Sequence, residues 1–362
     1  MTDASFALRR EMFGDKEREI ARLGDLSANV FRYDTGVEAI RLLNPRGQAV
    51  VLPFLGQMLW SAEFDGVGLA MRSMFAQPRP VATIVETYGC LAYHSGLLRN
   101  GVPGPGDTHP PHGEAPCAPM DSAGIVCGAD SRGRFLAITS KREYAMGFGA
   151  HYLSEPRITL HESDTALDIA MQVNNLSAAP MDLMYMCHVN FAYPEGARLV
   201  QAVPFTPEHV VARTAVPGHV TPNDAWRALL ADVAAHPGRL ERLDEPALYD
   251  PEFVFYLKGV PVQADGRVRY AMLRREGDAF AIRWNPEIMP HTVRWVLVNS
   301  DQSVAAFAMP ATCEPEGYSA EKRKGHVQTL EGGESAVFET EIAYVPRDQA
   351  AAVVTEIERG KA

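Results

Sequence analysis

Most of the chain consists of short runs in which apolar and polar residues alternate. In Ala166–Val173, the apolar side chains of Leu167, Ile169, Met171 and Val173 occupy every second position. Because successive side chains of a strand point to opposite faces, this spacing predicts a strand with one buried face. Between residues 27 and 66 such runs are separated by Asp-Thr-Gly, Asn-Pro-Arg-Gly and Asp-Gly, which are typical of hairpin turns.

Helical periodicity is confined to a few short segments. Residues 224–236 place apolar side chains at helical spacing behind an N-cap at Asn223 or Asp224, and residues 320–325 and 347–360 are further helical candidates. Many short strands without alternating helices argue against a parallel α/β fold. The pattern therefore predicts an all-β protein, a large antiparallel β-sandwich with a few short helices.

The chain contains no internal repeat or low-complexity linker that would divide it. We expect an N-terminal extension over residues 1–25, a single β-sandwich domain over residues 26–348 and a C-terminal tail over residues 349–362. The one long segment without a strand pattern is Leu97–Met120, which is rich in Pro and Gly. Because a loop this long inside a compact domain is usually functional or disordered, its two histidines favour function.

Composition and charge exclude several classes of function. The net charge of −11 argues against nucleic acid and anionic membranes as partners, because both require clustered Lys and Arg. No apolar run is long enough to span a membrane, and the first twenty residues lack the apolar core of a secretory signal, so we expect a cytoplasmic protein. Five widely spaced cysteines without a CxxC pair predict neither disulfides nor structural zinc. Nucleotide-binding and zinc-protease motifs are absent, so nucleotide-dependent chemistry and zinc proteolysis lack support.

A histidine interrupts the apolar segment "MYMCHVNFAYP" at residues 184–194. A lone strand histidine is usually a hydrogen-bonded core residue, but His188 shares one face of the predicted strand with Asn190. A small polar pair beside an apolar wall suits a sugar pocket, in which polar groups orient hydroxyls. Tyr193, at the end of this strand, could point to either face.

The long loop supplies the second group of candidates. His109 and His112 have a spacing that could suit a metal, but the prolines between them force extended backbone and no third ligand follows, so we expect no metal site. The favoured interpretation is that His112 donates a hydrogen bond to a ligand and that Gly113 lets the backbone bend where a Cβ would clash. His94 leads into this loop, and Arg99 within it is a candidate anion partner.

Carboxylates near strand ends complete the list of candidates. Asp250 precedes the alternating segment that begins at Phe253, and such a carboxylate often accepts hydrogen bonds from hydroxyls. Glu314 and Glu316 lie in a proline-rich turn after another strand. Each of these side chains is either part of a site or an ordinary solvated carboxylate, and residue type alone leaves both interpretations open.

The order of these segments resembles that of the aldose 1-epimerase, or galactose mutarotase-like, superfamily. It runs from the His-Gly loop through His-x-Asn-Phe-x-Tyr-Pro, Asp-x-x-Phe and Pro-Ala-Thr-Cys to the closing "GHVQTLEGGES", and it covers about residues 30–345. The resemblance implies a β-supersandwich with an open cleft on one sheet. It also implies acid–base chemistry on a small carbohydrate without a cofactor, and it leaves the choice between monomer and homodimer open.

In the mechanism that the resemblance implies, a strand histidine protonates the ring oxygen of a pyranose and a glutamate removes the proton of the anomeric hydroxyl. His188 is similar to that acid, His112 to a second histidine that orients hydroxyls, and Asp250 to a sugar-binding aspartate. The position of the basic glutamate is occupied by Met309, which cannot accept a proton. Two hypotheses follow. Either Glu314 or Glu316 replaces the base and the protein is an epimerase, or the protein binds carbohydrate without catalysis.

Overall fold

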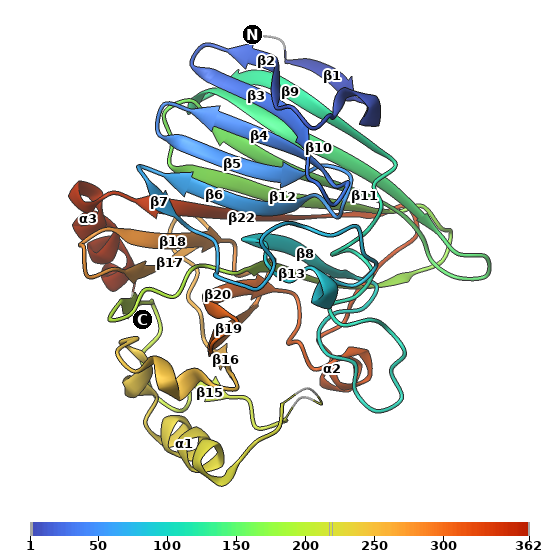
Figure 1. The fold of residues 1–362 in the computed structure, drawn as a ribbon. Helices are drawn as coiled ribbons and strands as arrows, with labels where there is room; N and C mark the ends of the chain where they lie inside the picture. The colour runs from blue at the N-terminus through green and yellow to red at the C-terminus, as the bar shows by residue number, and fades with distance from the viewer. Residues whose placement is uncertain (1–2, 217, 219, 361–362) are drawn as a thin grey trace.

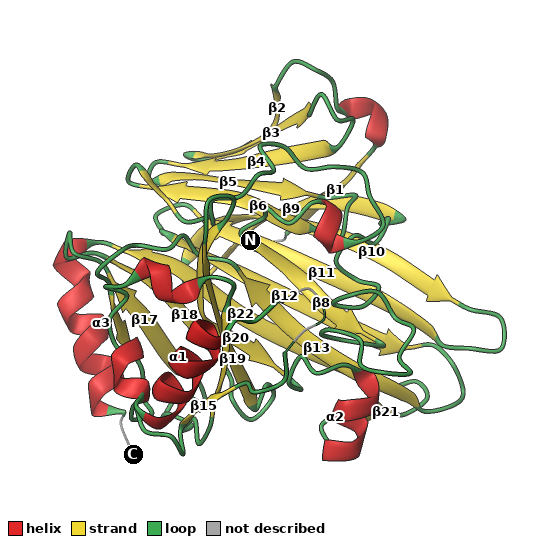
Figure 2. Cartoon of the chain, turned by 60° about the horizontal axis from the view of Figure 1, so that its bottom comes forward, coloured by secondary structure: helices red, strands yellow, loops and turns green. Residues whose placement is uncertain are grey.

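The structure is a computed structural model that describes residues 3–216, 218 and 220–360. Two large antiparallel sheets lie one upon the other, and the three α-helices lie at the periphery (Figures 1 and 2). The predicted all-β antiparallel sandwich with a few short helices is therefore confirmed. None of the described helices is long and apolar enough to cross a membrane.

The first sheet has nine strands. In spatial order these are β1 (Ala4–Leu8), β9 (Ser122–Asp130), β10 (Gly133–Ala145), β11 (His151–His161), β12 (Ala166–Asn175), β22 (Ser335–Val345), β18 (Ala279–Trp284), β17 (Val268–Leu273) and β14 (Arg198–Val200).

The second sheet has thirteen strands, of which two short ones pair at its side: β7 (Val67–Gly68) with β6, and β21 (Gln328–Leu330) with β13. In spatial order the other eleven are β15 (Val210–Ala212), β16 (Phe253–Leu257), β19 (His291–Val298), β20 (Ser303–Ala311), β13 (Met181–Val189), β8 (Ala92–Leu97), β6 (Met58–Phe64), β5 (Gly47–Leu52), β4 (Glu38–Asn44), β3 (Leu26–Arg32) and β2 (Arg18–Leu23).

The helices match the segments that showed helical periodicity. They are α1 (Asp224–Ala235), α2 (Tyr318–Lys324) and α3 (Arg347–Arg359). The side chain of Asn223 accepts a hydrogen bond from the backbone N–H of Trp226 and so caps α1, as the sequence predicts. Short 3₁₀ turns cover Arg10–Met12, Ile84–Glu86, Pro237–Leu240 and Pro246–Tyr249.

Both ends of the chain contribute to the folded body. The sequence predicts residues 1–25 to be an extension of the domain, yet β1 pairs with β9 in the first sheet and β2 pairs with β3 in the second. At the other end, Ala350 and Ile357 of α3 are buried in an apolar cluster with residues of β14, β17 and β18. Of the tail predicted over residues 349–362, the described part up to residue 360 is largely a helix packed on the first sheet, and residues 361–362 lie outside the described residues.

The main core lies between the two sheets and follows from the alternation. Leu167, Ile169, Met171 and Val173 of β12 are all buried there, as their spacing predicts. From the second sheet, the odd-numbered residues of β13 enter the same core, including Tyr185 and Cys187. The even-numbered residues of β13 point to the outer face of the second sheet, and His188 is one of them.

Candidate functional site

Strand pairing places His188 and His94 on opposite faces of the second sheet. β13 and β8 are antiparallel, with His188 opposite Tyr93 and Cys187 opposite His94. Residues directly opposite each other share a face, so His188 and Tyr93 point outward, while His94 points with Cys187 into the core. The rings of His188 and Tyr93 are stacked with their centroids 4.5 Å apart.

The long loop brings His112 to the same outer face. The backbone N–H of His112 donates to the carbonyl of Gly101 at 2.8 Å, and its own carbonyl accepts from the N–H of Gly96 at 2.9 Å. These bonds tie the loop to the end of β8 and bring the imidazole within 5.0 Å of that of His188, measured between ring centroids. The two histidines that the sequence singled out, 76 positions apart, therefore lie edge to face.

The hydrogen bonds around His112 define its tautomer. The shortest contact of the Ser95 hydroxyl is with Oδ1 of Asn100, and donation of its one hydrogen there assigns Nδ1 of His112 as the donor in the 3.2 Å contact with Ser95 Oγ. In the neutral ring, Nε2 is then an acceptor. The sequence analysis expects His112 to donate a hydrogen bond to a ligand, whereas this network favours acceptance from a ligand hydroxyl.

Gly113 is required where the loop turns back. Its φ is +80°, and a Cβ built on it would lie 2.0 Å from the carbonyl oxygen of Arg99. Gly113→Ala is therefore expected to cost more than the roughly 1 kcal/mol of left-handed strain alone, because the backbone that holds His112 must also move. Unfolding in urea would measure the loss of stability. Gly106 provides the matched control, because its φ of +90° is similar but its Cβ would meet nothing within 4 Å. Equal losses in Gly113→Ala and Gly106→Ala would contradict this account.

His188 and His112 line a pocket of about 560 Å³ on the outer face of the second sheet. The floor is formed by outward-pointing side chains of four neighbouring strands, β13, β20, β19 and β16. Loop residues form the walls, among them Tyr88, Arg213 and the segment Asp250–Glu252. Such a volume is within the range of about 300–1,000 Å³ that is typical of small-molecule sites.

Burial keeps His188 uncharged. The residue is 3% exposed, and the loss of hydration lowers the pKa of its imidazole well below the ordinary value, while a positive charge on the neighbouring His112 would lower this pKa further. Nε2 of His188 lies 3.2 Å from the hydroxyl of Tyr88, which lies 3.1 Å from the hydroxyl of Tyr93. Burial raises the pKa of Tyr88, so His188 and Tyr88 are both neutral near pH 7.

Three carboxylates line this pocket, those of Asp250, Glu252 and Asp301. Asp250 is exposed at the rim. Glu252 is half-buried, and its Oε2 accepts a hydrogen bond of 2.8 Å from the indole N–H of Trp295. The centroid of the Trp295 ring lies 6.0 Å from that of His188. The Glu252 carboxylate and the His188 imidazole therefore both lie beside this indole.

Glu314 does not line the pocket and is held by two lysines. Lys258 contacts its Oε1, and Lys324 donates to its Oε2 at 2.7 Å. Burial alone would raise the pKa of Glu314, but the two lysines outweigh this effect and hold the pKa below its ordinary value. A carboxylate stabilised in this way is a poor proton acceptor. Glu316 is similarly engaged, because it accepts hydrogen bonds from Tyr256 and Arg213.

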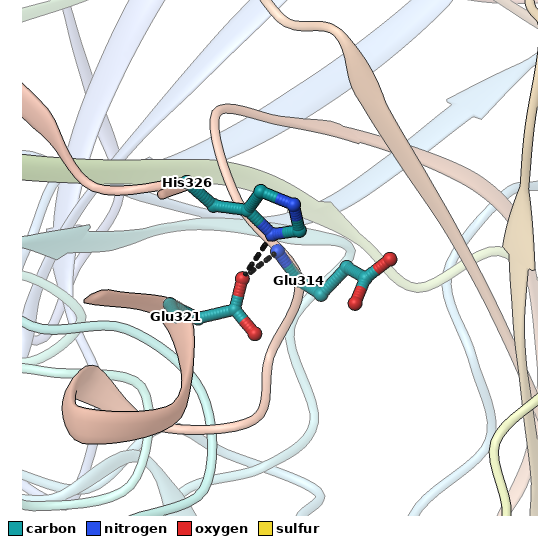
Figure 3. Close-up of side chains that lie close together, drawn as sticks. All are labelled: Glu314, Glu321 and His326. Atoms are coloured by element: carbon teal, nitrogen blue, oxygen red, sulfur yellow. Dashed lines mark hydrogen bonds and ion pairs between the residues drawn. The ribbon is translucent and has the colours of Figure 1, made fainter. Parts of the chain in front are cut away.

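Glu321 and His326 complete the cluster around Glu314 (Figure 3). The three side chains offer ligand atoms within 4.8 Å of one another. However, Oε2 of Glu321 accepts from the backbone N–H of Glu314 at 2.9 Å and from Nδ1 of His326 at 2.7 Å, while Lys324 joins both glutamates. The existing hydrogen bonds account for this cluster, which fixes the turn after β20 and leaves Pro315 at the pocket wall.

Four other predicted site residues lie away from the pocket lining. Asn190 is fully buried, and its side chain donates to the carbonyl of Cys90 at 3.0 Å. The Tyr193 hydroxyl donates to the carbonyl of Leu243 at 2.9 Å. Arg99 packs over the ring of Tyr318, and His94 lies 2.9 Å from the hydroxyl of Tyr185 in the core. These side chains brace the elements that form the pocket.

His94 should make stability depend on pH. Burial lowers its pKa from 6.5 to about 4, so between these pH values the unfolded chain takes up a proton that the folded chain does not. Stability should therefore fall as the pH decreases from 6.5 towards 4, with a slope of up to about 1.4 kcal/mol per pH unit for one histidine. Urea unfolding at pH 7 and pH 5 tests this, and His94→Gln should reduce the slope. If the slope is unchanged in that variant, His94 is not a source of the pH dependence of stability.

Three contributors to the pocket were missed in the sequence. Glu252 lies two positions after Asp250, so an extended backbone places both on one side, and this spacing could have revealed it. Trp295 shares its face with Val293 and Leu297 in an alternating segment, which marks a strand but not a ligand site. Tyr88 has no local signal, because only the tertiary fold brings its hydroxyl to His188.

Residues 34–344 match the model of a family described as a domain of unknown function, DUF4432. The chain belongs to the DUF4432 family. No curated protein matches this DUF4432 sequence significantly.

Solved structures share the fold of this DUF4432 chain. A candidate aldose 1-epimerase from Klebsiella pneumoniae superposes with a TM-score of 0.80 at 15% identity, over 100% of this chain and 96% of that one. The Slr1438 protein from Synechocystis reaches 0.60 at 13% identity, over 85% and 95% of the two chains. A galactose mutarotase-like protein from Clostridium acetobutylicum reaches 0.58 at 13% identity, over 89% and 99%. The likeness shows that this chain has the fold of these proteins, which is the fold that the sequence resemblance implies.

Proposed function

We propose that the protein interconverts the anomers of a free sugar or sugar derivative, as an isomerase of the aldose 1-epimerase type. The observation that carries the proposal is that Glu252 and His188 both lie beside Trp295 in one pocket. An indole face covers the C–H surface of a sugar well, while groups at its edges reach the hydroxyls.

The proposed reaction needs one acceptor and one donor. Glu252 removes the proton of the C1 hydroxyl while the bond between C1 and the ring oxygen breaks. His188, a neutral imidazole, donates a hydrogen bond that stabilises the negative charge developing on the ring oxygen. Its N–H proton passes to that oxygen and leaves an imidazolate until ring closure returns the proton. Rotation about C1–C2 and ring closure in the opposite sense return both protons and give the other anomer. His112 accepts a hydrogen bond from a sugar hydroxyl, and Asp250 at the rim accepts another.

Saturation-transfer NMR on a panel of free aldoses tests this function. The protein should transfer saturation between the α and β anomeric signals of at least one aldose faster than buffer does. A panel that shows no acceleration, under conditions in which the protein binds sugar, would overturn the proposal.

A second candidate is a carbohydrate-binding protein without catalysis. The specific observation in its favour is Met309, which lies in the pocket lining at the place where the sequence resemblance expects the basic glutamate. Saturable sugar binding with anomer exchange at the solvent rate would select this candidate.

A further inference from the structure

The pocket is larger and less polar than the reaction centre alone requires. The strand spacing in a sheet is about 4.8 Å, so the four-strand floor from β13 to β16 spans about 14 Å. Glu252, Trp295 and His188 account for the part that a single pyranose ring would cover. The remainder of the floor must contact some other part of the ligand.

The floor of that remainder is apolar, while Asn299, Asp301 and Gln302 line the pocket beside it. Met186, Met309, Val293, Leu297 and Val254 point into the pocket from β13, β20, β19 and β16, and all belong to one buried apolar cluster on the outer face of the sheet. Met309 pairs with Val293 across β20 and β19. These side chains offer no hydrogen-bond partner to sugar hydroxyls, so a fully hydroxylated ligand would lose hydration here without compensation.

The mouth of the pocket is apolar as well. Met74 is 58% exposed and Val85 is 54% exposed, and both line the pocket at its rim. Large apolar side chains left open to solvent around a cavity are typical of a surface that a ligand covers. The rim and the floor thus both indicate that part of the ligand is apolar.

Charges at the pocket disfavour an anionic ligand. Among the described lining residues, the carboxylates are Asp250, Glu252 and Asp301, and the only guanidinium is that of Arg213. Arg213 is already paired with Glu316, with Nη2 3.0 Å from Oε2. A phosphate or carboxylate on the sugar would therefore meet net negative potential.

We propose that the substrate is an uncharged aldose in which an apolar group replaces or caps one of the hydroxyls away from C1, such as a deoxy sugar or an O-alkyl sugar. This inference rests on the proposed function for its reacting centre and adds the substrate class. Leu297 and Met309 would then be specificity-determining residues, because they contact the apolar group.

A matched set of sugars tests the substrate class. The probes are D-galactose, 6-deoxy-D-galactose, 6-O-benzyl-D-galactose and D-galactose 6-phosphate, each examined for anomer exchange by NMR and for binding by calorimetry. At least one apolar derivative should exceed D-galactose in kcat/KM by roughly 10-fold or more, since each apolar group placed in such a pocket is worth about that factor. The phosphate should bind least.

The variant Leu297→Asn supplies an internal control. It should reduce the ratio of kcat/KM between the apolar derivative and D-galactose, and this ratio is independent of the fraction of folded protein because both sugars are measured on one preparation.

Exchange that is equally fast for D-galactose and its derivatives, or fastest for the phosphate, would overturn the substrate class while leaving the epimerase function intact. Binding with the expected ranking but without accelerated exchange would overturn the epimerase function and support the ligand class. If the protein neither accelerates exchange nor binds any of these sugars, both the epimerase function and the substrate class are overturned.

Discussion

Glu252→Gln is expected to slow anomer exchange by roughly 10²–10⁴-fold, which is the usual contribution of one general base. The amide keeps the shape of the side chain, and its oxygen can still accept the hydrogen bond from Trp295, but it cannot take the proton of the C1 hydroxyl. Sugar binding should therefore persist. Saturation-transfer NMR gives the rate, and calorimetry gives the affinity.

Glu314→Gln is the matched control for this prediction. Glu314 lies between Lys258 and Lys324 outside the pocket lining, so its loss leaves two partly exposed ammonium groups without their shared partner. This variant should unfold more easily in urea and retain most of its exchange rate. The opposite pattern, with loss of exchange in Glu314→Gln and near-normal exchange in Glu252→Gln, would return the basic role to Glu314.

The second large effect is expected for His188→Gln. This variant should also lose roughly 10²–10⁴-fold in exchange rate, because the ring oxygen loses the donor that stabilises it in the transition state. Near pH 7 the wild-type rate should not depend on titration of His188, since the burial-lowered pKa keeps that ring neutral. A pH–rate profile between pH 6 and 8 checks this point.

His94→Gln separates catalysis from folding. His94 is the same residue type on the adjacent strand, but it faces the core and contacts Tyr185. Its substitution should affect stability and leave the rate per folded molecule close to that of the wild type. Equal rate losses in both variants would mean that His188 acts only through the packing of the sheet.

The strand pattern predicted the architecture well because alternation reports directly on burial. β12 and β13 show this, since their odd-numbered residues enter the core as the spacing requires. The edges were harder to predict. Residues 4–8 and 18–23 have weak alternation. Residues 4–8 pair with β9, which is far away in the sequence, whereas residues 18–23 form a hairpin with the neighbouring β3.

Prediction of the site was less complete, for reasons that individual residues make clear. His188 and His112 could be selected because a histidine in an apolar strand and a His-Gly turn are locally unusual. Glu314 has the right chemistry, but the approach of Lys258 and Lys324 is a tertiary event that no local pattern announces. Asn190 was expected in the pocket from alternation, but the regular strand ends at Val189, and its side chain instead binds the carbonyl of Cys90.

The central claim is that a sugar ring lies over Trp295 between Glu252 and His188. A crystal structure of the protein with a 1-deoxy aldose, which cannot open its ring, tests this claim most directly. The account predicts the ring oxygen within hydrogen-bond distance of His188 and the C1 side of the ring facing the Glu252 carboxylate. A ligand bound elsewhere, or one whose C1 side faces Glu314 instead, would contradict it.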